Sequence, residues 1–251
     1  MESLRVYWRP GCSSCVKVKE FLSGLGIEYR SINVSAEPAA MDELRALGVR
    51  TVPVVARGRE YVFAQELADV SRFVGREVDF KRLAAPQLME KWRHVLAAAR
   101  RHVMQIPAER LRERATEGRD RSIRDLAWHV YQIPDAFLKA VIDGNPDLAS
   151  AYNAAPPPEV RTVSDIRDFG ARVTQRLEAW WAAQADESCG GTVTTYYGEQ
   201  PLHHLMERCT WHTAQHARQI VAVLERCGVA AEPPLTAKDY EGLPMPQGLW
   251  E

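Results

Sequence analysis

Two cysteines near the N-terminus, Cys12 and Cys15, are separated by two serines in the sequence CSSC. A strand-like apolar run precedes them and a helix-like run follows, so Cys12 is expected at a helix N-terminus, where unpaired N–H groups and the helix dipole favour a thiolate. Cys15 would follow about one turn later, within reach of a mixed disulfide on Cys12. This pattern predicts a redox pair with Cys12 as nucleophile and Cys15 as resolving thiol. Half of a zinc site and two buried thiols are the alternatives, and no second Cys or His pair follows at zinc-site spacing.

A second candidate site consists of histidines. His212 and His216 are four residues apart in HTAQH, a spacing that puts two imidazoles on one helix face, one turn apart. His129 lies within another helix-like stretch, LAWHVYQI. Three imidazoles on one metal ion would leave a coordination position open, which is typical of catalytic or substrate-binding sites. We therefore predict a metal site, with ordinary buried or surface histidines as the alternative, which is preferred for His94, His102 and His203.

Two more side chains fall on nearly the same predicted helix face as His212. His204 precedes it by two turns and is a candidate for lining the site. Cys209 precedes it by one turn, where it would either approach the metal or be an ordinary buried thiol, and the buried thiol is the preferred interpretation.

The chain changes character near residues 79–87. Residues 4–78 alternate between strand-like and helix-like runs, with a hairpin-like stretch followed by a closing helix-like run, which predicts a small sheet with helices on its faces. From about residue 86 the strand signals stop, and four long runs of helical period predict a bundle. The connection at about 143–163 is too long for a tight turn and predicts one crossover. Alternating arginines and acids between residues 109 and 125 are interpreted as a solvated helix face and turn rather than a phosphate-binding patch.

Composition limits the classes of partner. The 251 residues carry a formal net charge of −1 from 32 basic and 33 acidic residues, so no nucleic-acid partner is expected. No apolar stretch approaches the ~20 residues of a membrane span, and no membrane partner is expected either. Five dispersed cysteines are unlike a secreted disulfide framework, and the N-terminus lacks a signal-peptide layout, so we expect a cytoplasmic location.

Residues 1 to about 77 resemble a glutaredoxin. The resemblance rests on CSSC with the helix-like run after it, on TVP at 51–53, and on the hairpin-like VVARGREYVF. It implies a thioredoxin fold in which Pro53 follows a cis peptide bond and lies against the active-site sulfurs, while the Val52 backbone contacts the substrate thiol. Glutathione-binding members carry a Gly-Gly-x-x-Asp-like stretch where this chain reads FAQELADV. Glutathione, another low-molecular-weight thiol and a thioredoxin-type reductant therefore all stay open.

Residues from about 86 to 228 resemble the four-helix bundles of the DinB/YfiT-like family. The matching features are SIRDLAWH, the long crossover and HTAQHARQI. The resemblance implies that His129, His212 and His216 bind a divalent metal, commonly zinc or nickel. It also implies kinship with thiol-dependent transferases and isomerases that use mycothiol, bacillithiol or glutathione.

Together these features predict an α/β plus all-α protein. A glutaredoxin-like thioredoxin-fold domain is expected at 1–80, a linker at 81–87, and a DinB-like four-helix bundle with a Pro-rich tail at 88–251. The predicted function is a thiol–disulfide oxidoreductase coupled to a metal-dependent thiol transferase or isomerase. Its expected partners are small thiols, their mixed disulfides and a thiol reductase. The alternatives are a redox-responsive metal- or ligand-binding protein without turnover and a reductase tethered to a partner-binding helical module.

Overall fold

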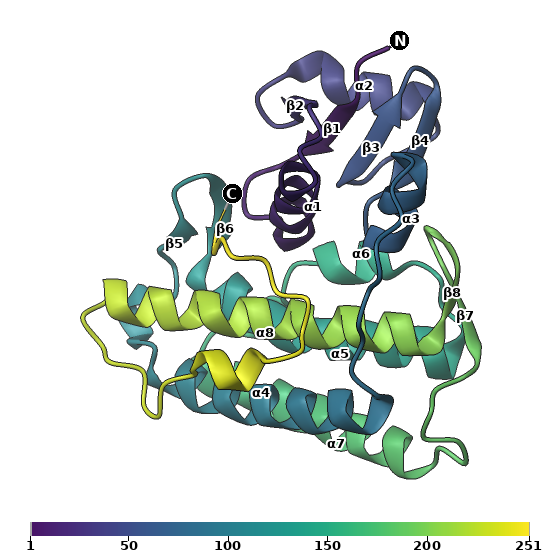
Figure 1. Ribbon diagram of the computed structural model, residues 1–251. Coiled ribbons are helices and arrows are strands. Elements are labelled where there is room, and N and C mark those ends of the chain that lie inside the picture. Colours follow the sequence, from purple (N-terminus) through teal and green to yellow (C-terminus); the bar gives the residue numbers. More distant parts are fainter. Residues whose placement is uncertain (1, 251) are drawn as a thin grey trace. The chain divides into compact units, whose positions relative to one another are not determined.

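The computed structural model describes residues 2–250 (Figure 1). It contains two compact units: an N-terminal unit, made of the described residues up to Lys81 and from Met245 onward, and a bundle unit, Arg82–Pro244. The outer limits of the predicted domains, residues 1 and 251, lie outside the described residues.

The N-terminal unit contains a four-stranded sheet. Its strands are β1 (Arg5–Trp8), β2 (Arg30–Asn33), β3 (Val54–Arg57) and β4 (Glu60–Phe63), in the order β2-β1-β3-β4. Strand β1 is parallel to β2 and antiparallel to β3, and β3 forms a hairpin with β4. The parallel pair is joined through helix α1 (Ser13–Gly24), as parallel strands require a crossover.

Helices cover both faces of this sheet, because alternate strand residues are apolar on both sides. Tyr7 and Val54 belong to one core cluster, with Leu44 of α2 (Pro38–Ala46). The neighbouring strand residues Val6 and Val55 belong to the other, with side chains of α1 and α3 (Leu67–Phe73). The predicted thioredoxin fold is confirmed.

The end of the chain adds to the N-terminal unit. The backbone N–H groups of Gln247 and Gly248 donate to the Glu20 carboxylate on α1, at 2.8 and 2.7 Å. The sequence analysis assigned the whole Pro-rich tail to the bundle, whereas residues from Met245 onward lie with the N-terminal unit.

The bundle unit contains four long helices, as predicted. They are α4 (Ala85–Gln105), α5 (Ile123–Asp143), α7 (Val163–Ala182) and α8 (Leu202–Arg226). Helix α4 packs on α7 and α8, and α5 packs on the same two, so α4 and α5 lie on one diagonal of the bundle. The amphipathic pattern of each helix faces this common core, where Trp92, Phe137 and Trp211 are fully buried.

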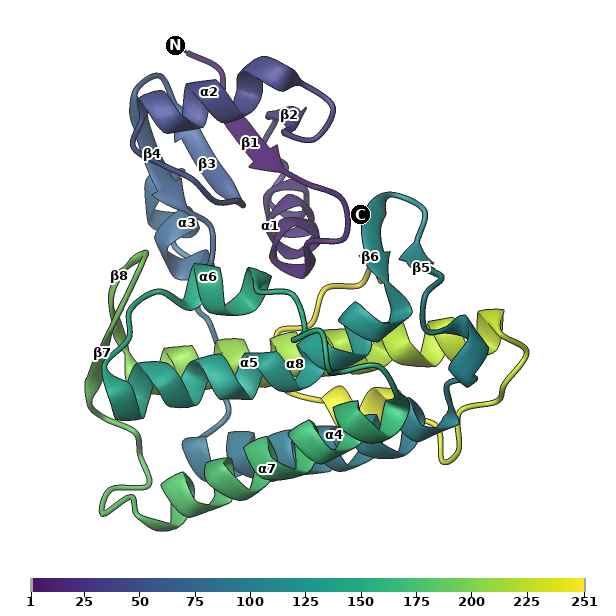
Figure 2. The same cartoon turned by 180° about the vertical axis from the view of Figure 1, so that it is seen from behind.

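The connection between α5 and α7 crosses back along the bundle. Figure 2 shows these two helices packed side by side and running in the same direction, with the short helix α6 (Leu148–Asn153) in the connection. This matches the crossover that the length of the connection predicted, and it places α6 beside α5.

The bundle unit also contains strands, which the sequence analysis did not expect after residue 86. One hairpin joins β5 (Arg114–Thr116) to β6 (Arg119–Ser122), and another joins β7 (Thr192–Thr195) to β8 (Gly198–Pro201). Two short 3-10 helices, Ala108–Arg110 and Ala237–Tyr240, complete the elements. The arginine-rich segment interpreted as a solvated helix face is therefore largely the β5–β6 hairpin.

Among residues 2–250, no helix combines the length and the apolar character that crossing a membrane requires.

Candidate functional sites

The two N-terminal cysteines form a disulfide at the start of α1. Cys12 is the N-cap residue of this helix, and its sulfur accepts a hydrogen bond from the Cys15 backbone N–H at 3.2 Å. Their Cα atoms are 5.2 Å apart. Cys15 is fully buried, whereas Cys12 is partly exposed. An attacking thiol would therefore meet Cys12 first.

The predicted thiol-binding residues lie in the same part of the N-terminal unit. The Val52–Pro53 peptide bond is cis, as the glutaredoxin resemblance implied. Val52 and Cys15 are members of one apolar cluster, and Cys12 packs against that cluster. The fold thus brings Cys12, Cys15 and Val52 together, and Pro53 is the next residue along the chain.

The three predicted metal ligands converge inside the bundle. His129 comes from α5, and His212 and His216 come from successive turns of α8. Their candidate ligand atoms all lie within 4.8 Å of one another, and all three side chains are buried. The Nε2 atoms of His212 and His216 are 3.1 Å apart, close to the separation of about 3.3 Å that two nitrogens on one tetrahedral zinc ion would have. We call these three residues the histidine cluster.

A glutamine sets the protonation of His129. The Gln132 side-chain amide donates to the Ala154 carbonyl at 2.8 Å, which leaves its oxygen facing His129 Nδ1 at 3.0 Å. A carbonyl oxygen only accepts, so His129 Nδ1 carries the proton and Nε2 keeps its lone pair. Partners of this kind orient metal-binding histidines in proteins.

His216 has the same arrangement. Its Nδ1 lies 2.5 Å from the side-chain oxygen of Gln219, one helical turn further along α8. Both pairs follow a His-x-x-Gln spacing, which the sequence shows and which the sequence analysis missed. Two lone pairs held in this way fit a divalent metal ion of the zinc or nickel type.

Burial keeps these imidazoles neutral. Desolvation lowers the pKa of His129 and His216 well below the ordinary histidine value, and the positive charge of Arg121 lowers both further. Neutral imidazole is the form that a metal ion would bind, so both side chains are in a metal-competent form at neutral pH.

Tyr152 of α6 lies against the histidine cluster. Its ring centroid is 5.6 Å from that of His212, and its hydroxyl accepts from Arg208 at 3.2 Å and lies 3.3 Å from Cys209 Sγ. Burial raises the pKa of Cys209 to about 11, so this thiol is protonated at neutral pH. Within the described part of the chain, Cys209 is not a member of the group of potential metal ligands.

The remaining histidines have other contacts. His94 pairs with Asp239 at 2.7 Å, and the rings of His102 and His203 lie 2.8 Å from the carbonyl oxygens of Pro233 and Leu83. His204 lies beside His203, with ring centroids 6.1 Å apart. None of these four belongs to the histidine cluster as described.

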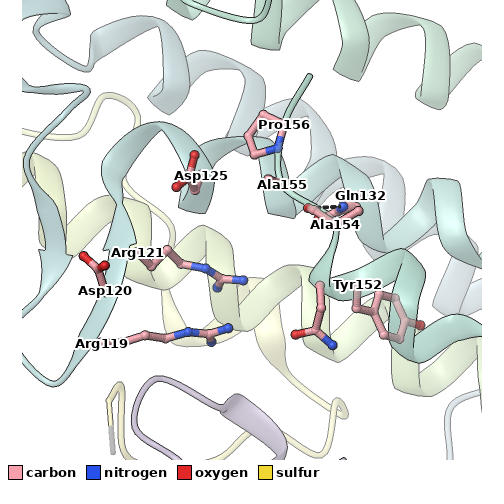
Figure 3. Close-up of a pocket in the computed structure, with 10 residues that line it drawn as sticks. Arg119, Asp120, Arg121, Asp125, Gln132, Tyr152, Ala154, Ala155 and Pro156 are labelled. Atoms are coloured by element: carbon pink, nitrogen blue, oxygen red, sulfur yellow. Dashed lines mark hydrogen bonds between the residues drawn. The ribbon is translucent and has the colours of Figure 1, made fainter. Parts of the chain in front are cut away.

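A pocket of about 150 Å³ adjoins the histidine cluster (Figure 3). Arg119 and Arg121 of β6 line one side, and Gln132 and Tyr152 line the other, next to the segment 154–156. We call it the arginine pocket. Gln132 and Tyr152 connect it to the histidine cluster, because each borders the pocket and contacts a cluster histidine.

The fold and these sites define a two-domain protein, a glutaredoxin-type domain followed by a four-helix bundle with a buried histidine cluster. The glutaredoxin family model matches residues 4–62, and the model of the DinB superfamily matches residues 84–220. The chain belongs to the DinB superfamily and carries an N-terminal glutaredoxin domain.

Several known proteins are similar to portions of this chain. Glutaredoxin-like protein NrdH of Salmonella typhimurium is 39% identical over 56 residues, which are 22% of this chain and 69% of the relative. N-acetyl-S-hydroxy-L-cysteine reductase of Bacillus subtilis is 42% identical over 55 residues, 22% of this chain and 59% of the relative. Among solved structures, a mycothiol-dependent maleylpyruvate isomerase matches with a TM-score of 0.43 and 16% identity, over 57% of this chain and 63% of its own.

Proposed function

We propose that this protein is a thiol–disulfide oxidoreductase whose bundle carries out metal-dependent S-transfer or isomerisation with a low-molecular-weight thiol. One observation carries the proposal. Three buried imidazoles from two helices converge on one point beside a pocket, in a chain whose other domain has a cysteine pair at a helix N-terminus.

In the N-terminal unit the proposed chemistry is thiol–disulfide exchange. The Cys12 thiolate attacks one sulfur of a mixed disulfide, forms a bond to it and expels the other sulfur as a thiolate. Cys15 then attacks Cys12, which releases the bound thiol and leaves the Cys12–Cys15 disulfide. Two electrons from a thiol reductase restore the dithiol. Val52 and Pro53 would position the incoming disulfide against Cys12.

In the bundle the proposed roles belong to the histidine cluster and its neighbours. A bound divalent ion, zinc or nickel, would supply Lewis acidity and favour the thiolate form of a coordinated thiol. His129, His212 and His216 would hold the ion through neutral nitrogens, with Gln132 and Gln219 orienting two of them. The buried surroundings exclude water from the ligands.

The cluster supports turnover rather than storage of metal. It contains three potential ligands within residues 2–250, and a three-ligand site keeps a position open for substrate. The alternative, a redox-responsive binding protein, would be favoured by a fourth protein ligand.

A shared thiol would connect the two domains. Glutathione, mycothiol or bacillithiol would serve the bundle and form the mixed disulfides that Cys12 reduces, and fusion raises the local concentration of one domain for the other. A reducing, cytoplasmic setting is part of this proposal, because Cys189, Cys209 and Cys227 are free thiols.

Metal analysis of the full-length protein tests the proposal. We expect about one zinc or nickel ion per chain, because three histidines supply one site. His129→Ala, His212→Ala and His216→Ala should each lose it. Gln132→Ala should weaken binding by about 10- to 100-fold, since it removes the partner that orients His129.

His94→Ala is the matched control, because this exposed histidine pairs with Asp239 outside the cluster. The proposal is wrong if the triple histidine variant retains full metal content, or if His94→Ala loses metal as completely as the cluster variants.

A further inference from the structure

A second cavity lies at the end of the bundle where α5 and α7 begin. These two helices run in the same direction (Figure 2), so their N-termini share one end of the bundle unit. The cavity has a volume of about 400 Å³, within the ~300–1,000 Å³ of sites that hold whole small molecules. We call it the end pocket. It is lined by Ala108, Glu109, Leu111, Arg112, Arg124 and Arg161.

Three segments of the chain each bring one arginine to the end pocket. Arg112 follows the first 3-10 helix, Arg124 is the second residue of α5, and Arg161 lies just before α7. The Arg124 backbone N–H donates to the Leu111 carbonyl at 2.9 Å, which joins the first two segments. Alternation with acids predicted a solvated face for Arg112 and Arg124. The fold adds a third arginine from outside that stretch and places all three around one cavity.

These arginines have N–H donors left for a ligand. Among residues 2–250, neither Arg112 nor Arg161 forms an ion pair, and Arg161 uses its Nε to donate to the Pro158 carbonyl at 3.1 Å. Arg124 donates to Asp125 through Nε and one terminal nitrogen, at 3.0 and 2.9 Å, so its other terminal nitrogen stays available. Guanidinium N–H groups form strong, charge-assisted hydrogen bonds with anions.

The acids around the end pocket leave it a positive lining. Glu109 is the acid that lines it. Asp125 is bonded to Arg124, and Asp165 accepts from two backbone N–H groups of the N-terminal cap of α7, at 2.9 and 2.8 Å. Neither aspartate lines the cavity, whose lining carries three positive groups and one negative group. The positive ends of two helix dipoles add to this balance, which favours an anion.

The number of arginines favours phosphate over carboxylate. Guanidinium groups from three segments match the tetrahedral oxygens of a phosphate, whereas a carboxylate offers two oxygens in one plane. A phosphate ester carries a charge of about −1.5 to −2 at pH 7, which fits the positive excess of the lining.

The rest of the lining indicates what the phosphate is attached to. A cavity of about 150 Å³ is sufficient for benzene, which has more heavy atoms than a phosphate group, so the end pocket has room for an organic body. Leu111 and Ala108 offer apolar contact to a carbon skeleton. The Glu109 carboxylate forms no hydrogen bond or ion pair with the residues that the structure describes, and it accepts hydrogen bonds only, so it suits hydroxyl groups.

We propose that the end pocket binds a phosphate ester of a small polyhydroxylated molecule, the chemistry of a sugar phosphate. The phosphate binds Arg112, Arg124 and Arg161. The hydroxyl groups donate to Glu109, and the carbon skeleton lies against Leu111. The site is separate from the histidine cluster and does not depend on the proposed function.

Calorimetric titration of the full-length protein in phosphate-free buffer tests the site, with glucose 6-phosphate, glucose and inorganic phosphate as probes. Glucose 6-phosphate should bind at least about tenfold more tightly than glucose, because only the ester forms charge-assisted hydrogen bonds. Arg112→Gln and Arg161→Gln should each weaken its binding by about tenfold or more. Both arginines are exposed, so neither substitution disturbs the core.

Glu109→Ala tests the hydroxylated part of the ligand. The substitution removes an acceptor for hydroxyl groups and also a charge that repels phosphate. Inorganic phosphate should therefore bind more tightly, while the preference for glucose 6-phosphate over inorganic phosphate should fall by about threefold or more. An unchanged preference would overturn the polyhydroxylated class of ligand.

Two substitutions of the same kind are controls. Arg172→Gln removes an exposed arginine of α7 outside the end pocket, and Arg119→Gln removes one from the arginine pocket. Neither should weaken binding of glucose 6-phosphate. Far-ultraviolet circular dichroism and the urea midpoint verify folding. If Arg112→Gln is not folded, Arg112→Lys stands in, and it should weaken binding by a smaller factor because it keeps the charge without the paired donors.

Three results would overturn the site. They are equal affinity for glucose 6-phosphate and glucose, affinity that both arginine variants retain, and an equal loss in Arg172→Gln, which would indicate a general effect of charge. Binding of inorganic phosphate as tight as that of the ester would also overturn it, since the organic body would then contribute nothing. Loss or retention of metal in the histidine variants bears on the proposed function alone.

Discussion

At the scale of single residues, the two cysteines of the disulfide have different surroundings. Cys12 caps α1 and is partly exposed, so its sulfur lies among the unpaired N–H groups of the first turn. Cys15 lies inside the helix and is fully buried in the apolar cluster that contains Val52. The first position favours a thiolate and the second favours a thiol.

After reduction of the full-length protein, Cys12 should be alkylated faster than Cys15 near neutral pH. The rate for Cys12 should rise with a midpoint below the ordinary cysteine pKa of about 8.5, because the helix N-terminus stabilises its thiolate. Site-resolved mass spectrometry after timed iodoacetamide treatment measures both rates.

Substitution of each cysteine completes this test. Cys12→Ser should abolish disulfide reduction, whereas Cys15→Ser should accumulate a mixed disulfide on Cys12. Equal alkylation rates for the two thiols in the reduced protein would show that the assignment of nucleophile and resolving thiol is wrong.

At the scale of elements, helix α5 begins where hairpin β5–β6 ends. Ser122 is the last residue of β6 and the N-cap of α5, and its hydroxyl accepts from the Asp125 N–H at 3.1 Å. The strand that carries Arg119 and Arg121 therefore continues directly into the helix that carries His129. This continuity keeps the pocket wall and His129 on one stretch of backbone.

Helices α5 and α7 approach each other closely at a glycine. A Cβ atom added to Gly170 of α7 would lie 2.6–2.7 Å from ring atoms of Tyr131 on α5. Tyr131 is buried between the helices, so its ring has little room to move. The small residue at this position lets the two helices pack against each other.

Gly170→Ala should therefore destabilise the bundle. Overpacking costs about 1–3 kcal/mol, and the better helix propensity of alanine offsets about 1 kcal/mol of this. We expect a net loss of up to about 2 kcal/mol, which urea unfolding followed by circular dichroism would measure.

Gly24→Ala in α1 is the comparison, because a Cβ there meets nothing within 4 Å. That variant should be neutral or stabilised by up to about 1 kcal/mol. Equal effects of the two substitutions would contradict a steric role for Gly170.

At the scale of the whole molecule, the buried histidines couple stability to pH. Burial lowers the pKa of His129 and His216 in the folded chain, and burial also lowers that of His102. The unfolded chain therefore binds more protons than the folded chain between the lowered values and the ordinary value of about 6.5. The free energy of unfolding must fall as pH decreases through this window.

In metal-free protein, the free energy of unfolding should begin to fall as pH decreases below about 6.5. The decrease should reach up to about 1.4 kcal/mol per pH unit for each of these histidines. Urea unfolding at pH 7, 6 and 5 in the presence of a chelator measures it. The carboxylates with lowered pKa, such as Asp165 and Asp239, release their contribution only at lower pH.

The double variant His129→Gln/His216→Gln should have a shallower pH dependence than the native chain, with the part due to His102 retained. A stability that stays constant from pH 7 to pH 5 in the native chain would contradict the neutral, buried state of the cluster.

Local patterns in the sequence were sufficient to predict the fold class of both domains. The cysteine spacing, the strand-like and helix-like runs of residues 4–78 and the helical period after residue 86 each depend on neighbours within a few positions, and the thioredoxin fold and the bundle are both present. The spacing of His212 and His216 placed them on one helix face for the same reason.

Tertiary contacts decided the rest of the candidate sites. The orientation of Gln132 depends on the Ala154 carbonyl, 22 residues away, and no local pattern contains that contact. The segment Arg119–Ser122 consists of charged and polar residues without an apolar face, so its strand period was obscured and a solvated helix face and turn were predicted instead. Pairing with β5 makes it a strand and turns Arg119 and Arg121 toward one pocket.

Sequence alone determined which residues could do chemistry, because residue type and helical spacing are local. Only the folded chain decided which of them meet, because that depends on packing between segments far apart in sequence.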